Sequence, residues 1–252
     1  MFATTWLAYF EGNARCDRLA PSSLCAEVPA ALRAPLAVSL GRFQLGESAG
    51  GRIHEEMNAP ADRELDGAAR RSVQLYIEEE WRHARELASI VVALGGELQR
   101  AHWTNSAFTA CRRVLGLRTK MMTLAVAEVI GIVYYRALAR GVGSPALATS
   151  LERIANEESQ HLDFQAAYFE HVLSATPAAL RQLRRWLLRA LLYGILAAAL
   201  AVLLLDHGSL LRRVGARSNA LGRAALQELE RRRFLEGRPR RSASTLPASA
   251  PS

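Results

Sequence analysis

Four apolar helical stripes, each interrupted by a glutamate, are the feature that most constrains the fold of this chain. The apolar residues recur with the three- and four-residue spacing of one buried helix face. The interrupting residues are Glu47, Glu80, Glu128 and Glu158. Because an uncompensated carboxylate in an apolar core costs several kcal/mol, four such residues need a shared explanation.

The stripes lie on four long helical segments, predicted at about residues 34–57, 66–94, 118–140 and 145–175. Proline and glycine residues end the first two segments, and Ser144 followed by Pro145 is a typical start for the fourth. The connection between the second and third segments is long, and the other two are short. This order predicts an all-α four-helix bundle with a crossover between helices two and three.

Three further segments flank the bundle, which is assigned to residues 34–175 of the 252-residue chain. Residues 1–33 have weak periodicity and several turn residues, so a loosely ordered lead-in is expected. Residues 176–236 contain an apolar helix and then a charged helix. The tail, residues 237–252, is rich in Arg, Ser, Pro and Ala and is expected to be disordered.

The run of three glutamates at residues 78–80 shows how a stripe selects one inward residue. The apolar stripe of the second helix continues directly through Glu80 and His83. Glu79 lines up instead with Arg82 and Glu86, which predicts an ordinary solvated face. Of the three glutamates, only Glu80 is therefore expected to point into the core.

The spacing Glu-x-x-His occurs twice, and each pair follows another stripe glutamate on a separate helix. The two matching sets are Glu47, Glu80 and His83, and Glu128, Glu158 and His161. Four carboxylates and two neutral imidazoles balance the charge of two divalent cations, and these ligands suit iron or manganese better than copper or structural zinc. The alternative is a bundle in which buried acids and imidazoles pair with each other without metal.

This layout resembles the ferritin-like di-iron carboxylate proteins, and most closely the bacterioferritin and rubrerythrin pattern, over residues 35–175. The resemblance implies two iron ions as the cofactor, with manganese or a mixed iron–manganese pair as variants. By position, the resemblance implies that Glu80 and Glu158 bridge the two metals. It implies that Glu47 and Glu128 are terminal carboxylate ligands, and that His83 and His161 each cap one metal. The two bridging carboxylates would be the catalytic residues.

The resemblance implies an oxidoreductase that uses O₂ or peroxide, with an organic substrate and an electron donor that the sequence does not identify. The chain has no CxxC rubredoxin module, so electrons are not expected to arrive as in a full rubrerythrin. A metal-storing or metal-sensing bundle without organic turnover is the first alternative, and a purely structural helical module is the second. A homodimer is one expected assembly.

Three residues near the expected ligands leave two interpretations open. Tyr76 and Tyr135 lie on the inward stripes, where each hydroxyl either hydrogen-bonds a ligand or belongs to an ordinary core tyrosine. Gly131 lies close to Glu128 and either leaves space for a small molecule or allows close helix packing.

Charge and cysteine usage bear on partners and compartment. The net charge is +8, and from residue 177 onward 14 arginines accompany only 4 acidic residues. No nucleic-acid-binding motif accompanies this basic segment, so no nucleic-acid partner is expected. The three cysteines form no CxxC pair, and the first residues lack the positive charge of a secretory signal, so a cytoplasmic location is expected.

The apolar segment at residues 186–205 has arginines on both sides. Its uncharged run is slightly shorter than the roughly 20 residues that span a bilayer. Three arrangements are consistent with this pattern: a helix buried against the bundle, a helix lying in a membrane surface, and a short transmembrane anchor. The sequence pattern alone leaves all three open.

Overall fold

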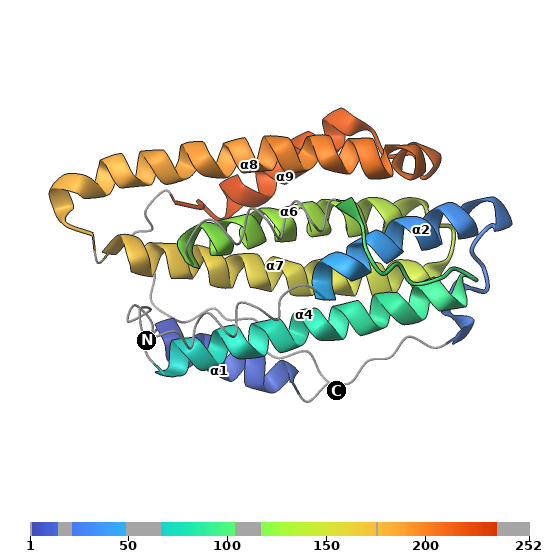
Figure 1. Cartoon of the computed structure of the whole chain (residues 1–252), viewed down its shortest axis with the longest axis horizontal. Coiled ribbons are helices and arrows are strands. Elements are labelled where there is room, and N and C mark those ends of the chain that lie inside the picture. Colours follow the sequence, from blue (N-terminus) through green and yellow to red (C-terminus); the bar gives the residue numbers. More distant parts are fainter. Residues whose placement is uncertain (1, 15–21, 49–66, 104–116, 175, 236–252) are drawn as a thin grey trace.

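Every regular element in the described part of the chain is helical, which confirms the all-α prediction (Figure 1). The computed structural model describes residues 2–14, 22–48, 67–103, 117–174 and 176–235. The elements are α1 (Phe2–Asn13), the 3₁₀ turn η1 (Ser22–Cys25), α2 (Ala30–Glu47), α4 (Gly67–Ala93), α6 (Leu117–Gly141), α7 (Pro145–Ser174), α8 (Ala178–Arg213) and α9 (Ser218–Arg231).

The helices α2, α4, α6 and α7 form a bundle built from two helical pairs. The helix α2 packs along α4, and α6 packs along α7 (Figure 1). Their apolar stripes meet in a core of buried side chains that includes Leu36, Leu87, Leu138, Leu151 and Phe169. Since burial of such side chains is the main favourable contribution to folding, the periodic stripes account for the packing of all four helices.

The helix ends match the predicted ends closely where the turn chemistry is explicit. The Oγ of Ser144 accepts a hydrogen bond from the backbone N–H of Leu147, as an N-cap does. Gly95 ends α4 with a φ of 83°, a conformation that favours glycine. The first bundle helix differs from its prediction because it begins earlier, at Ala30. Its predicted extension to residue 57 lies outside the described residues.

The N-terminal segment differs from the loosely ordered lead-in that was expected. Residues Phe2–Asn13 form α1, which packs against α4 and also contacts α7 (Figure 1). Trp6 and Phe10 are buried, and the ring of Phe10 lies 5.3 Å from that of Phe164 in an edge-on contact. The helix α1 therefore covers the outer face of α4 that the sequence pattern assigned to solvent.

The helix α8 lies along the opposite side of the bundle from α1 (Figure 1). It contacts α6, α2 and α7, and its buried residues include Leu192, Leu196, Leu203 and Leu210. Two described helices, Thr119–Gly141 and Ala178–Arg213, are long and apolar enough to cross a membrane. The first is 83% buried inside the bundle, whereas the most apolar part of the second is only 22% buried. The longest apolar helix thus has one covered face and one exposed face.

Candidate metal centre

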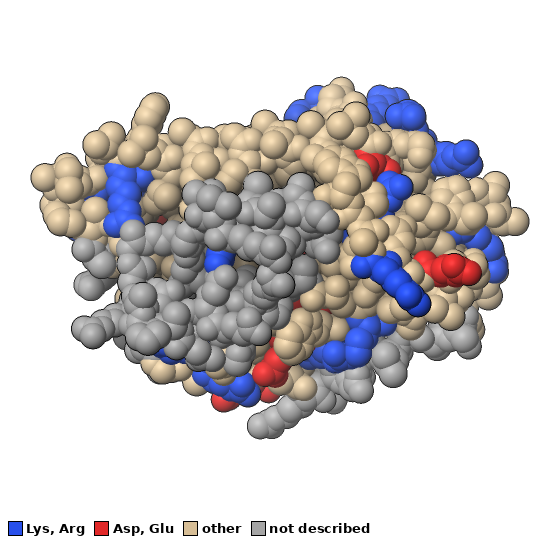
Figure 2. Space-filling view, viewed as in Figure 1, with Lys and Arg blue, Asp and Glu red and all other residues tan. Residues whose placement is uncertain are grey.

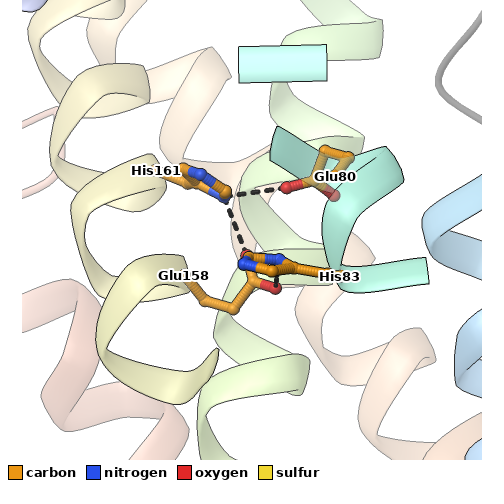
Figure 3. Close-up of side chains that lie close together, drawn as sticks. All are labelled: Glu80, His83, Glu158 and His161. Carbon is orange, nitrogen blue, oxygen red and sulfur yellow. Dashed lines mark hydrogen bonds and ion pairs between the residues drawn. The ribbon is translucent and has the colours of Figure 1, made fainter. Parts of the chain in front are cut away.

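Four of the predicted ligands converge between α4 and α7, where their side chains point toward one another (Figure 3). They are Glu80 and His83 from α4, and Glu158 and His161 from α7. A three-residue separation places a glutamate and a histidine on the same helix face, so each Glu-x-x-His pair presents both ligands together. All four side chains are buried, as the stripes predicted.

The ligand atoms of these residues lie within 4.8 Å of one another. The Nδ1 atom of His161 lies 2.8 Å from Oε1 of Glu80 and 2.9 Å from Oε2 of Glu158. The Nδ1 atom of His83 lies 2.9 Å from Oε1 of Glu158. The carboxylate of Glu158 is therefore shared between the two histidines.

Several of these close contacts lack hydrogen-bond alignment. Within the described residues, Oε1 of Glu80, Nδ1 of His83 and Oε1 of Glu158 are buried and have no hydrogen-bond partner. Buried polar atoms are normally hydrogen-bonded, so buried ligand atoms that converge without such bonds are suited to hold a shared cation. Carboxylate oxygens and imidazole nitrogens at this separation fit a divalent transition metal.

The other two predicted ligands, Glu47 and Glu128, lie beside the four-residue cluster. Oε2 of Glu128 lies 3.9 Å from Nδ1 of His161, and its Oε1 accepts hydrogen bonds from the hydroxyl of Tyr76 and from Nε2 of Gln165. Oε1 of Glu47 accepts a 2.9 Å hydrogen bond from the hydroxyl of Tyr135. Each of the two tyrosines therefore holds a carboxylate of the predicted set.

A cavity of about 150 Å³ adjoins the cluster and contains all four stripe glutamates in its lining. Its opposite wall comes from α8, through residues such as Ala199, Leu203 and His207. Gly131 also lines the cavity, and a Cβ placed there would lie 3.8 Å from Cγ of Glu158. That is ordinary van der Waals distance, so the glycine widens the cavity locally but is not required by close helix packing.

A second pair of carboxylates contacts the outer nitrogens of the two histidines. Oε2 of Glu157 makes a 2.8 Å hydrogen bond with Nε2 of His83, and Oε2 of Glu79 lies 3.5 Å from Nε2 of His161. Each histidine is thus contacted by a glutamate from the other helix. A carboxylate on Nε2 orients the ring, and when it accepts the Nε2 proton it favours metal binding through Nδ1.

The burial of Glu79, and of Glu86 two turns further along α4, corrects the sequence prediction of a solvated face. The side chain of Glu79 is 2% exposed, because α1 covers it and Nδ2 of Asn13 donates a 3.2 Å hydrogen bond to its Oε1. Arg82, on the same face, forms a 2.8 Å ion pair with it. A signal was present in the sequence: in both motifs, a second glutamate directly precedes the Glu-x-x-His pair.

Burial and carboxylate crowding shift the pKa values in the metal-free centre. Burial first, and the neighbouring carboxylates second, raise the pKa of Glu158 to about 8 and that of Glu80 well above its usual value. Burial alone would lower the pKa of His83 and His161, but the surrounding carboxylates outweigh it and raise both. Without metal, the centre therefore retains protons that a cation would displace.

Comparisons with protein-family models, with curated proteins and with solved structures found no match to this chain. The function is therefore inferred from the geometry and chemistry of the centre itself.

We expect the outer glutamates to contribute measurably to metal affinity. Glu157→Gln should weaken binding of Fe²⁺ or Mn²⁺ by about 10- to 100-fold, because the histidine loses the partner that orients it. Glu79→Gln should have a smaller effect, since its contact with His161 is longer. Calorimetric titration measures both. The matched controls are Glu152→Gln and Glu78→Gln, two half-exposed positions on the same helices; an equal loss in the controls would contradict this role.

The far wall of the cavity contains a buried polar network with its own pH dependence. Nδ1 of His207 lies 2.7 Å from Oγ of Ser39, which lies 2.6 Å from the hydroxyl of Tyr134. Burial lowers the pKa of His207 to about 3. The unfolded chain therefore takes up a proton before the folded chain does as the pH falls below about 6.5.

This network should lose stability on acidification. Relative to His207→Gln, the wild-type chain is expected to lose roughly 2 kcal/mol of unfolding free energy between about pH 7 and about pH 5. Urea unfolding at each pH measures the difference between the two proteins. The exposed His171→Gln serves as the control, and a difference that does not change with pH would contradict the prediction.

Proposed function

We propose that the chain is a ferritin-like di-iron protein and acts as an oxidoreductase on O₂ or peroxide. The observation that carries this proposal is the convergence of Glu80, His83, Glu158 and His161 as buried ligands, several of whose ligand atoms have no hydrogen-bond partner among the described residues. A pair of manganese ions or a mixed pair would fit the same atoms. An all-helical bundle with ligands projecting inward from facing helices is the architecture in which such centres are built.

In this proposal, the carboxylates of Glu80 and Glu158 would hold both metals and would be the catalytic residues. Their place between the histidines supports this role, because Glu158 approaches Nδ1 of both His83 and His161. Glu47 and Glu128 would complete the set from the cavity side. Small side-chain rotations would bring Glu128 to a metal, since its Oε2 already lies 3.9 Å from Nδ1 of His161.

Bound iron would supply the two electrons for reduction of O₂ or peroxide, and the chain would control access and protonation. Phe10 and α1 cover one side of the centre and exclude water there. The hydroxyls of Tyr76 and Tyr135 hold Glu128 and Glu47 in place. The cavity, whose lining is mostly apolar, gives an organic substrate a place beside the carboxylates.

An anaerobic titration with Fe²⁺ followed by exposure to O₂ tests the proposal. The expected result is two Fe²⁺ bound per chain, oxidation on mixing with O₂, and repeated cycles when a chemical reductant is added. A single oxidation that never repeats would instead indicate iron handling without turnover. Binding of no metal, with an unchanged melting temperature, would leave only a structural helical module.

A further inference from the structure

The outer face of α8 is an uninterrupted apolar stripe on the surface of the protein. Between residues 186 and 205 the exposed positions, which carry no charged side chain, are Trp186, Leu187, Ala190, Leu191, Gly194, Ala197, Ala198, Ala201, Leu204 and Leu205. Toward the N-terminus the stripe continues through Leu183 and Leu180, which are 57% and 56% exposed. Contiguous exposed apolar surface of this length is rare on a protein that contacts only water.

The opposite face of α8 is packed against the bundle, so the helix cannot rotate to bury the exposed stripe. Leu192, Leu196 and Leu203 pack into the bundle core, while Leu203 and His207 also line the cavity. Arg42 donates a hydrogen bond to the backbone carbonyl of Asp206 and thereby attaches α8 to α2. The exposed stripe is therefore a fixed outer surface of the bundle.

Arginines stand at both ends of the stripe. Between Ala178 and Arg217 the chain contains seven arginines and one acidic residue, Asp206. Four arginines lie at or before residue 189 and three lie at or after residue 212. Figure 2 shows the same division: uncharged surface follows α8, and basic side chains gather toward its ends.

We propose that α8 seats the protein on an anionic lipid bilayer, with the helix lying in the plane of the membrane surface. The apolar stripe would enter the boundary between headgroups and acyl chains, and the arginines would contact lipid phosphates on both sides. Trp186 lies among the N-terminal arginines of α8 and is 64% exposed, and tryptophan favours such a place at the membrane interface.

Two alternatives, pairing with a second copy of α8 and a transmembrane orientation of α8, fit the structure less well. A second copy of α8 would bring arginine clusters together in either a parallel or an antiparallel pairing, because both ends are basic. A spanning orientation would carry α6 and α2 into the hydrocarbon layer, since α8 packs against both.

Co-sedimentation of the intact chain with lipid vesicles tests the proposal and requires neither bound metal nor turnover. The chain should bind vesicles of equimolar phosphatidylcholine and phosphatidylglycerol more tightly than vesicles of phosphatidylcholine alone. Leu183→Glu with Leu187→Glu should weaken this binding by more than about 100-fold. The control, Val92→Glu with Leu98→Glu, changes two similarly exposed residues on another face and should leave binding unchanged.

The arginines and the depth of insertion provide two further readouts. Arg212→Gln with Arg213→Gln should lower affinity for the anionic vesicles by about fivefold for each arginine, whereas Arg71→Gln with Arg85→Gln should not.

The emission of Trp186, obtained as the difference between the wild-type chain and Trp186→Phe, measures the depth of insertion. Brominated lipids should quench this emission more when the bromines lie near the headgroups than when they lie at the bilayer centre. Stronger quenching at the centre would overturn the flat orientation. Absence of vesicle binding, or a dimer that Leu183→Glu with Leu187→Glu dissociates, would overturn the membrane proposal.

Discussion

Between about pH 5 and about pH 8, the metal-free protein is expected to lose unfolding free energy as the pH rises, and bound Fe²⁺ is expected to reverse that slope. The pKa values of Glu80 and Glu158 are raised by burial first and by neighbouring carboxylates second. The folded state therefore keeps protons that the unfolded chain has already released, and its advantage falls as the pH rises. With a folded pKa of about 8, Glu158 alone accounts for roughly 3 kcal/mol over this range.

The two histidines change stability in the same direction. The carboxylates around His83 and His161 raise their pKa values despite burial, so these rings also hold protons that the unfolded chain loses near pH 6.5. A bound cation removes all of these protons in the folded state. The cation binds only the folded chain, and it binds more tightly as the ligands lose their protons. The unfolding free energy of the metal-bound protein therefore increases with pH.

Urea unfolding followed by circular dichroism, under anaerobic conditions and with or without Fe²⁺, measures both slopes. The control is Glu158→Gln, which should flatten the metal-free slope because it removes the residue whose folded pKa lies near 8. Identical slopes with and without Fe²⁺ would mean that the cluster binds no cation and that the buried acids and imidazoles only pair with each other.

Removal of the carboxylate of Glu80 or Glu158 is expected to have the largest effect on metal binding. Glu80→Ala or Glu158→Ala should lower the affinity for Fe²⁺ by at least about 1,000-fold, because each carboxylate belongs to the buried four-residue cluster. The metal-free variants should remain folded and be more stable than the wild-type chain near pH 8. Each substitution removes a buried carboxyl that the neighbouring carboxylates disfavour in its charged form.

Equilibrium dialysis gives the metal stoichiometry, and thermal unfolding gives the stability of the metal-free proteins. Glu78→Ala is the matched control, since Glu78 directly precedes the glutamate pair and its side chain is 49% exposed. Wild-type affinity in both alanine variants would exclude the centre as a metal site. Loss of folding in the metal-free variants would show that the carboxylates stabilise the core by pairing.

The inward direction of the six predicted ligands could be predicted because helix periodicity fixes it. A glutamate within an apolar stripe shares the environment of its neighbours, as the burial of Glu80, Glu128 and Glu158 shows. The periodicity of one helix does not show what covers its other faces. Glu79 was assigned to solvent for this reason, because its burial depends on α1, a separate and weakly periodic segment.

The arrangement of α8 could not be predicted for a related reason. The helix is apolar around most of its circumference between residues 186 and 205, so its sequence does not distinguish the packed face from the exposed one. The distinction comes from the side chains of α6 and α2 against which it packs. The cavity also depends on several helices at once, since α2, α4, α6, α7 and α8 all line it.

The crossed contacts of the histidines have a consequence for how the two halves of the bundle are aligned. His83 on α4 is held by Glu157 on α7, and His161 on α7 is approached by Glu79 on α4. A sliding movement of either helical pair by one turn, about 5.4 Å, would break both contacts together. The axial alignment of the two halves is thus tied to the same side chains that would hold the metals, so loading the centre should restrict shear between them.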